Sequence, residues 1–165
     1  MPNRRREEGS KGKGMKSCPK GKGLHFFLIV ILLLVDQIVK TYLSIFPQGE
    51  VVYDLLPGFF NIKILVNPGI AFGVLANLPQ VFIWVNTCIL ISFLIYFLFC
   101  LNTRALYLSF ALIIAGAASN LIDRFIYGGV IDYLNFAFFP TFNLADSYIT
   151  VAICLMLKDA IFRKE

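Results

Sequence analysis

Four long apolar spans constrain this chain more than any other feature of its sequence. They cover about residues 24–46, 81–101, 105–122 and 144–162. Each is close to the roughly 20 residues that an α-helix needs to cross the hydrocarbon core of a bilayer. The chain is 58% hydrophobic and 15% charged, which is too apolar for a soluble domain. The sequence therefore predicts an all-α membrane protein with four transmembrane helices.

The first span is predicted to stay in the protein as a helix. It is longer than the apolar region of a secretory signal peptide, and no Ala-x-Ala cleavage site follows it.

Positive charge is concentrated ahead of the first span. Residues 1–24 hold eight Lys or Arg against two Glu, whereas the rest of the chain has seven basic and eight acidic residues. Residues 1–23 have too few apolar side chains to form a core, so we expect a disordered basic cytoplasmic arm, with Met15 as an alternative start. Residues 24–165 are expected to form one four-helix membrane domain. Because that domain has no basic stripe with interleaved aromatics, nucleic acid is not a predicted partner.

The positions of Lys and Arg near the span ends predict the orientation. The basic arm, Arg104 between the second and third spans, and Lys158, Arg163 and Lys164 at the C-terminus all fall on one side. Since basic residues favour the cytoplasmic side, both termini are predicted to be cytoplasmic. The loops 47–80 and 123–143 are then extracytoplasmic.

The loop 47–80 is predicted to form a small extracytoplasmic β-sheet between helices 1 and 2. Its short β-branched and aromatic runs are interrupted by Pro57-Gly58 and by Asn67-Pro68-Gly69, which are typical of turns between antiparallel strands. An open sheet edge is not tolerated within lipid, so this sheet should lie at the membrane interface.

Two charged residues interrupt the first span. Asp36 and Lys40 are four residues apart, so they lie on one helix face in the favourable order of acid before base. They could form an internal ion pair with Lys40 reaching outward along the helix, or they could belong to a functional site.

A second polar group ends the third span. Asn120, Asp123 and Arg124 are spaced to share one face of the last helical turn. A purely structural helix cap with an ion pair and a functional site are both compatible with this spacing.

Two further aspartates follow, one on each side of an aromatic run. Asp132 comes after Gly128-Gly129, and Asp146 falls in the first turn of the fourth span. Asn143 and Asp146 could simply cap that helix. Alternatively, Asp132 and Asp146 form a carboxylate pair in which one acid activates water while the other donates a proton.

Other catalytic schemes are disfavoured. The lone His25 lies at the cytoplasmic border, no H-E-x-x-H motif occurs, and none of the four cysteines stands in a C-x-x-C pair. Lys40 and Lys63 have no serine partner in a recognisable motif. We therefore predict no metal and no cofactor.

Two non-protease functions remain open from the residues alone. Asp36, Asp123 and Asp146 could line the path of an ion transporter, or the protein could be a membrane scaffold. A transporter predicts acids at several depths, whereas Asp123, Asp132 and Asp146 are expected at one membrane face.

Five blocks of this chain, in this order, resemble the lipoprotein signal peptidase family, also called signal peptidase II. They are Asp36-Gln-x-x-Lys40, Asn67-Pro-Gly-Ile-Ala-Phe-Gly73, Gly116-x-x-x-Asn120-Leu-Ile-Asp-Arg124, Gly129-Val-Ile-Asp132-Tyr and Phe142-Asn-Leu-Ala-Asp146-Ser. The chain departs from the family pattern at Ser119, at Pro68, in the short linker between Asp132 and Asp146, and in its basic arm.

The resemblance implies an aspartyl endopeptidase of the bacterial cytoplasmic (inner) membrane with its active site at the outer face. Its substrates would be diacylglyceryl-modified prolipoproteins, cut just before the lipidated cysteine, and globomycin-like cyclic peptides would inhibit it. The resemblance makes Asp132 and Asp146 catalytic and Asp123 structural. The implied supporting or substrate-binding residues are Asp36, Lys40, Asn67, Gly69, Asn120, Arg124 and Asn143.

Overall fold

A computed structural model describes residues 22–69, 79–100 and 104–162. The arm predicted for residues 1–23 lies outside this part of the chain except for its last two residues, which already belong to a helix. Most of the Asn67–Gly73 block, from Ile70 onward, also lies outside the described residues.

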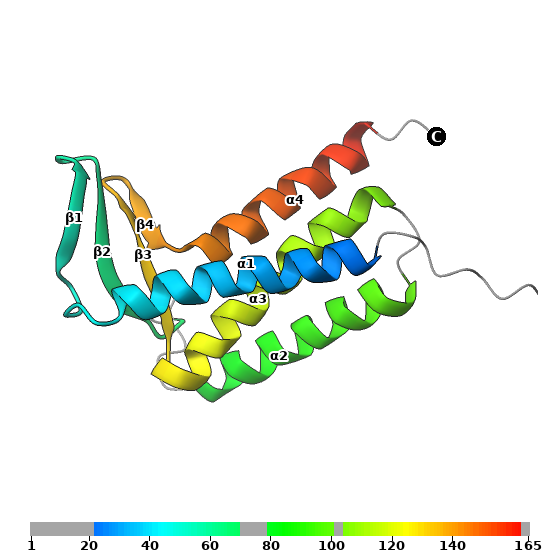
Figure 1. Cartoon of the computed structure of the whole chain (residues 1–165), viewed down its shortest axis with the longest axis horizontal. Helices are drawn as coiled ribbons and strands as arrows, with labels where there is room; N and C mark the ends of the chain where they lie inside the picture. Colours follow the sequence, from blue (N-terminus) through cyan, green and yellow to red (C-terminus); the bar gives the residue numbers. More distant parts are fainter. Residues whose placement is uncertain (1–21, 70–78, 101–103, 163–165) are drawn as a thin grey trace, which may run out of the picture.

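Four helices form where the four apolar spans are (Figure 1). They are α1 (Lys22–Leu43), α2 (Pro79–Ile95), α3 (Arg104–Tyr127) and α4 (Leu144–Phe162), and a π-helical segment, Tyr96–Cys100, continues α2. By length and hydropathy, residues 23–43 of α1 and 106–127 of α3 could each cross a membrane, and the apolar stretch 83–99 is shorter. The helix ends differ from the predicted span ends by a few residues, most at α3, whose polar last turns extend to Tyr127.

Helix α3 is the centre of the bundle and packs against α1, α2 and α4 (Figure 1). Small side chains make this possible, because Ala111 and Ala115 are fully buried on α3 and Ala145 and Ala152 on α4. At Gly116 the backbone of α4 comes so close that a Cβ would lie 2.5 Å from the carbonyl oxygen of Ala145. Gly116 therefore sets the distance between α3 and α4.

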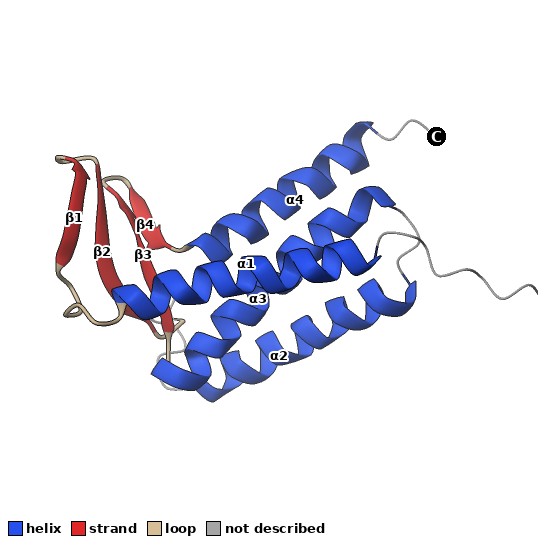
Figure 2. Cartoon of the chain, viewed as in Figure 1, coloured by secondary structure: helices blue, strands red, loops and turns tan. Residues whose placement is uncertain are grey.

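A four-stranded antiparallel sheet lies at one end of the bundle (Figure 2). Its strands are β1 (Val51–Leu56), β2 (Phe60–Asn67), β3 (Val130–Phe136) and β4 (Phe139–Phe142), paired in that order. The sheet predicted between helices 1 and 2 accounts for only two of the four strands, β1 and β2, because β3 and β4 lie between α3 and α4. The predicted all-α fold class therefore has to be extended to include a four-stranded sheet. An isolated two-stranded hairpin is marginal in water and leaves an unpaired edge, whereas pairing β2 with β3 covers that edge.

The pairing of β2 with β3 brings two distant parts of the chain together. Asn67 lies opposite Val130, and Leu65 lies opposite Asp132. Gly129 permits this approach, since a Cβ there would lie 2.8 Å from the carbonyl oxygen of Asn67. The sheet is fastened to the helices by a cluster of buried residues: Leu43, Ile64, Ile131 and Tyr133.

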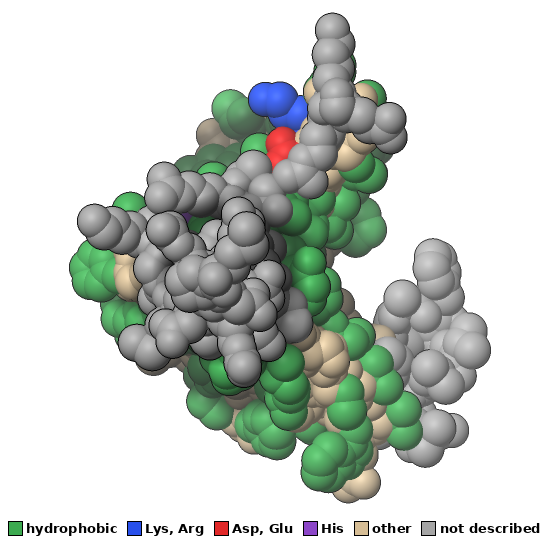
Figure 3. Space-filling model, turned by 90° about the vertical axis from the view of Figure 1, so that its right-hand side faces the viewer, with side chains coloured by type: hydrophobic (Ala, Val, Ile, Leu, Met, Phe, Trp, Pro, Cys, Tyr) green, Lys and Arg blue, Asp and Glu red, His purple; other side chains and the backbone are tan. Residues whose placement is uncertain are grey.

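The outer surface of the helices is apolar. Phe26, Trp84, Phe99 and Ile161 are 59–79% exposed. Seen from the end opposite the sheet, hydrophobic side chains cover most of the described surface, and charges appear only near one edge (Figure 3). Contiguous apolar surface of this extent is typical of a protein surrounded by lipid.

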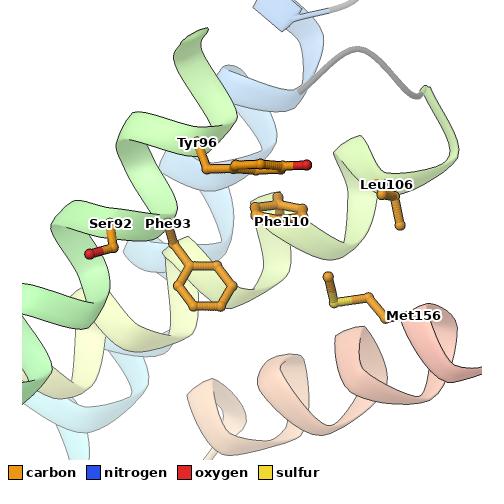
Figure 4. A pocket seen from close by; sticks show the side chains of 6 residues that line it. All are labelled: Ser92, Phe93, Tyr96, Leu106, Phe110 and Met156. Atoms are coloured by element: carbon orange, nitrogen blue, oxygen red, sulfur yellow. The ribbon is translucent and has the colours of Figure 1, made fainter. Parts of the chain in front are cut away.

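An apolar groove of about 320 Å³ lies between α2, α3 and α4 (Figure 4). The rings of Tyr96 and Phe110 stack along it with centroids 5.1 Å apart, and Met156 reaches in from α4. Its lining contains no carboxylate or amide side chain, so this groove is separate from the polar residues described next.

We expect Gly116→Ala to destabilise the bundle, because the new methyl group would collide with the α4 backbone and with Ile149. Overpacking of this kind costs roughly 1–3 kcal/mol. Gly23→Ala on α1 is the matched control, since a Cβ there meets nothing within 4 Å. Thermal unfolding in detergent should show a lower Tm for Gly116→Ala alone. Equal Tm values for the two variants would contradict this account of the α3–α4 contact.

Candidate active site

Polar side chains converge where the sheet meets the helices. Seven of them are buried to 7% exposure or less, and they come from α1, α3, β3 and the residue before α4: Asp36, Lys40, Ser119, Asn120, Asp123, Asp132 and Asn143. Buried polar groups are stable only when they are paired, so their contacts define the site.

Lys40 is the central cation of this network. Its Nζ atom lies 2.7 Å from Asp36 Oδ2 and 2.8 Å from Asp123 Oδ2, and it donates a 2.9 Å hydrogen bond to Asn120 Oδ1. Its side chain is fully buried, so the interpretation in which Lys40 reaches outward is wrong. The ammonium group neutralises part of the charge of two acids, and together they tie α1 to α3.

Three further residues belong to this network: Gln37 and Tyr133, to which the sequence assigned no role, and Ser119, for which it predicted only close helix packing. The Gln37 amide donates to Asp123 Oδ1 at 2.9 Å and to Ser119 Oγ at 2.8 Å, and Ser119 Oγ donates to Asp36. The Tyr133 hydroxyl donates to Asp36 Oδ1 at 3.5 Å. Burial raises the pKa of Tyr133, which keeps its proton available for this bond. Gln37 is a polar residue within an apolar span, and such residues usually face the interior of a helical bundle. This feature of the sequence could have predicted that Gln37 belongs to the network.

Asp132 lies on β3 and is held by two amide groups. Asn67 Nδ2 donates to its Oδ2 at 3.0 Å, and Asn143 Nδ2 donates to its Oδ1 at 2.8 Å. Only 4% of the residue is exposed. Burial raises the pKa of Asp132 to about 6, although the two amide hydrogen bonds oppose the shift. Asp132 is therefore a carboxyl group that can gain or lose a proton near neutral pH.

Asp146 occupies the first turn of α4. Asn120 Nδ2 donates to its Oδ1 at 2.8 Å. Its backbone N–H donates to Asn143 Oδ1 at 2.9 Å, while the backbone N–H of Asn143 donates to Asp146 Oδ2 at 3.3 Å. This reciprocal pair is a capping box, so the capping interpretation of Asn143 and Asp146 is confirmed. Capping does not remove the carboxyl group from the site, because its Oδ1 still bonds Asn120.

Asn143 connects the two carboxyl groups. Its side-chain amide bonds Asp132 and its backbone amide bonds Asp146, so both carboxyl groups contact a single residue. Asn120 is bonded to Asp146 on one side and lies 3.2 Å from the Asn143 amide on the other. The charge of Asp146 also contributes to raising the pKa of Asp132, so ionisation of one carboxyl group disfavours ionisation of the other.

Gly69 and Arg124 lie beside this arrangement, whereas Asp123 lies in its buried interior. Asn67 Oδ1 accepts a hydrogen bond from the Gly69 N–H at 3.0 Å, and this turn aims the Asn67 amide at Asp132. Arg124 Nη1 donates to the Asn120 carbonyl oxygen on its own helix, at 3.0 Å. Asp123 pairs with Lys40, so the ion pair that helix spacing suggested within α3 is replaced by one to α1. The described residues contain no group of three or more His, Cys, Asp or Glu that could hold a metal.

The raised pKa of Asp132 predicts a pH-dependent penalty on stability. Because its folded pKa of about 6 exceeds the usual value of 3.8, folding favours the protonated acid. This contribution is complete below pH 4 and is lost as the pH rises through about 6. Asp132→Asn does not titrate, so its Tm relative to the parent protein should rise between pH 4 and pH 7. The corresponding gain in the free energy of unfolding, relative to the parent protein, should be about 3 kcal/mol at most. A Tm difference that stays constant across this range would contradict the assignment.

An apolar helical bundle with two amide-bonded carboxyl groups at one end is the arrangement expected of a membrane aspartic peptidase. Comparison with known proteins gives the family. Residues 28–162 match the family model of signal peptidase (SPase) II, which covers most of the chain. The chain belongs to the signal peptidase II family.

Curated relatives agree with this assignment. Lipoprotein signal peptidases of Moorella thermoacetica and Halothermothrix orenii are 37% and 33% identical, over 79% and 80% of this chain and 89% and 91% of their own lengths. The lipoprotein signal peptidase of Burkholderia thailandensis is 40% identical over 81% of this chain and 85% of its own length.

Two solved structures of bacterial membrane enzymes share the fold. One has a TM-score of 0.77 at 28% identity and covers 87% of this chain and 95% of its own. The other has a TM-score of 0.75 at 29% identity, with 87% and 93% covered. The predicted activity, an aspartic endopeptidase that removes signal peptides from prolipoproteins, is confirmed by the family. The transporter and scaffold alternatives are thereby excluded.

Proposed function

We propose that Asp132 and Asp146 are the catalytic pair, and that they cut a prolipoprotein just before a diacylglyceryl-modified cysteine. The observation that carries this proposal is the bridge through Asn143, whose side-chain amide bonds Asp132 at 2.8 Å and whose backbone amide bonds Asp146. The other two buried aspartates, Asp36 and Asp123, are 0% exposed and both pair with Lys40, so they lie in the interior that supports the pair.

The pair works as one base and one acid. The ionised carboxyl takes a proton from a water molecule, and the resulting hydroxide attacks the scissile carbonyl carbon. The protonated carboxyl gives its proton to the carbonyl oxygen, which produces a neutral tetrahedral diol. When the C–N bond breaks, the first carboxyl returns its proton to the leaving amine and the second recovers one from the diol. The raised pKa of Asp132 suits it to carry the initial proton.

The surrounding residues orient this pair. Asn67, Asn120 and Asn143 each donate an amide N–H to a catalytic carboxyl, which fixes the carboxyl planes. Asp36 and Asp123 hold Lys40, and Lys40 bonds the Asn120 side chain, so we assign Asp123 a structural role. Arg124 has a buried Nε without a partner among the described residues. We assign Arg124 and the Gly69 backbone to binding of the substrate's peptide groups.

The same proposal includes the topology. Residues 24–165 form a peptidase domain with four membrane-spanning helices in the bacterial cytoplasmic (inner) membrane, and membrane lipid surrounds them. Both termini are cytoplasmic, and the sheet and the catalytic pair are at the outer face. Globomycin-like cyclic peptides would occupy the substrate site. Two facts support this arrangement. The sheet lies at one end of the bundle, and most Lys and Arg residues, namely those of residues 1–24 with Arg104, Lys158, Arg163 and Lys164, fall near the other ends of the spans in the sequence.

Asp132→Asn and Asp146→Asn should each abolish cleavage of a lipidated prolipoprotein peptide by purified protein. An amide keeps the shape of the side chain but can neither accept a proton from water nor share one. Because the two acids act as a unit, the double variant should be hardly slower than either single variant. Turnover must be normalised to correctly folded enzyme.

Asp123→Asn is the control for that experiment. It loses the ion pair with Lys40, and its NH₂ group must face a buried donor, either the Ile131 N–H or the Gln37 amide. The yield of folded protein should therefore fall by far more than turnover per molecule. If Asp123→Asn were inactive at full yield and Asp132→Asn retained near-normal turnover, Asp123 would have to replace Asp132 in the pair.

Reporter fusions test the topology. A reporter placed after Leu78 or Phe138 should read as outside, and one after Arg104 or Glu165 as cytoplasmic, because Lys and Arg are enriched at the latter ends. An outside signal at Arg104 would refute the outer-face active site.

A further inference from the structure

Five phenylalanines form an exposed aromatic surface at the turn end of the sheet. Phe59, Phe136, Phe138, Phe139 and Phe142 line a hollow of about 360 Å³, which we call the phenylalanine surface. Phe59, Phe138 and Phe139 are 51%, 94% and 63% exposed. Neighbouring rings are in contact, with centroids 5.6–5.9 Å apart for three pairs: Phe59–Phe136, Phe136–Phe142 and Phe139–Phe142. Among the described residues, no charged or polar side chain lines the hollow.

The phenylalanine surface is continuous with the catalytic pair along β3. Asp132 and Phe136 are four residues apart on this strand, so they point to the same face of the sheet and lie about 13 Å apart. The extra residues that disturb the register lie in β2 and β4, which leaves the alternation of β3 intact. On the other side of the hairpin, Phe142 directly precedes Asn143, the residue that bonds both carboxyl groups.

A lipid attached next to the scissile bond cannot enter the protein interior. Behind the catalytic pair, Asp36, Lys40 and Asp123 fill a fully buried, charged interior that excludes hydrocarbon. On the face of β3 that carries Asp132, the next two side chains are the apolar Leu134 and Phe136. Half of a bilayer's hydrocarbon core, the span of one acyl chain, is roughly 15 Å, which covers the distance from Asp132 to Phe136.

The phenylalanine surface shares a face of β3 with Asp132 and lies within one acyl-chain length of it. We therefore propose that the phenylalanine surface binds an acyl chain of the diacylglyceryl group on the substrate cysteine. The inference rests on the proposed function, because it places that cysteine beside Asp132 and Asp146. The phenylalanine surface contacts no reacting atom, so it contributes binding and selects lipidated over unmodified precursors.

The test compares two prolipoprotein peptides that differ only in acyl length, dipalmitoylglyceryl and dibutyrylglyceryl, in detergent micelles. The variant Phe138→Ala/Phe139→Ala removes the two most exposed rings. Its KM for the dipalmitoyl peptide should rise about tenfold, since that ratio corresponds to losing part of the burial of two aromatic side chains. Its kcat, and its KM for the dibutyryl peptide, should stay within twofold of the parent values.

Two matched variants accompany this one. Phe99→Ala removes a ring that is 79% exposed at the opposite end of the bundle, and it should change neither KM. Phe138→Leu/Phe139→Leu keeps an apolar surface and should restore most of the affinity for the long chain. An equal rise in KM for both peptides would overturn the proposal and make the phenylalanine surface a general bilayer anchor. An unchanged KM for the dipalmitoyl peptide would also overturn it.

Failure of the proposed function is recognised separately. Asp132→Asn is assayed on the dibutyryl peptide, which does not depend on the phenylalanine surface. Activity of that variant would refute the catalytic pair whatever the chain-length result. An inactive Asp132→Asn together with chain-length-independent KM values would refute only the acyl-chain site.

Discussion

A single buried ammonium group holds this site together. Lys40 bonds Asp36 on its own helix, and Asp123 and Asn120 on α3, and no part of it reaches solvent. Removing charges from water is costly, so such a cluster persists only because each charge has close partners. A lysine can only donate hydrogen bonds, so the Asn120 side chain must turn its oxygen toward Lys40. Its NH₂ group is thereby directed at Asp146.

The cap of helix α4 and the contacts of the two proposed catalytic carboxyl groups share one residue, Asn143. Asn143 and Asp146 complete the capping box of α4, and the Asn143 side-chain amide also bonds Asp132. The first turn of α4 is therefore fixed by the bonds that position the carboxyl groups. A buried, partly protonated Asp132 is unfavourable for stability at neutral pH, and the amide bonds from Asn67 and Asn143 limit that penalty. Burial of Asp132 therefore has two effects: it raises the pKa of the carboxyl group toward neutrality, and it lowers the stability of the folded protein at neutral pH.

Part of the fold and site could be predicted because it depends on near neighbours in the sequence. Hydropathy located all four helices, and the spacing of Asn143 and Asp146 predicted a cap that the structure contains. The orientation of Lys40 could not be predicted, because an inward or outward side chain satisfies the same i,i+4 pairing with Asp36. Gln37 and Tyr133 were assigned no role, since their partners lie on other elements.

By itself, the sequence determined where the chain is apolar enough to enter a membrane, where its helices begin, and which blocks relate it to signal peptidase II. Those features depend on local hydropathy, local capping and residue identity. Only the tertiary structure decided that β2 pairs with β3, that Asn67 meets Asp132 across 65 residues of chain, and that Lys40 meets Asn120 across 80. Such pairings form because strand edges and buried charges need partners once the helices have packed. Local sequence patterns do not show which distant residues will become those partners.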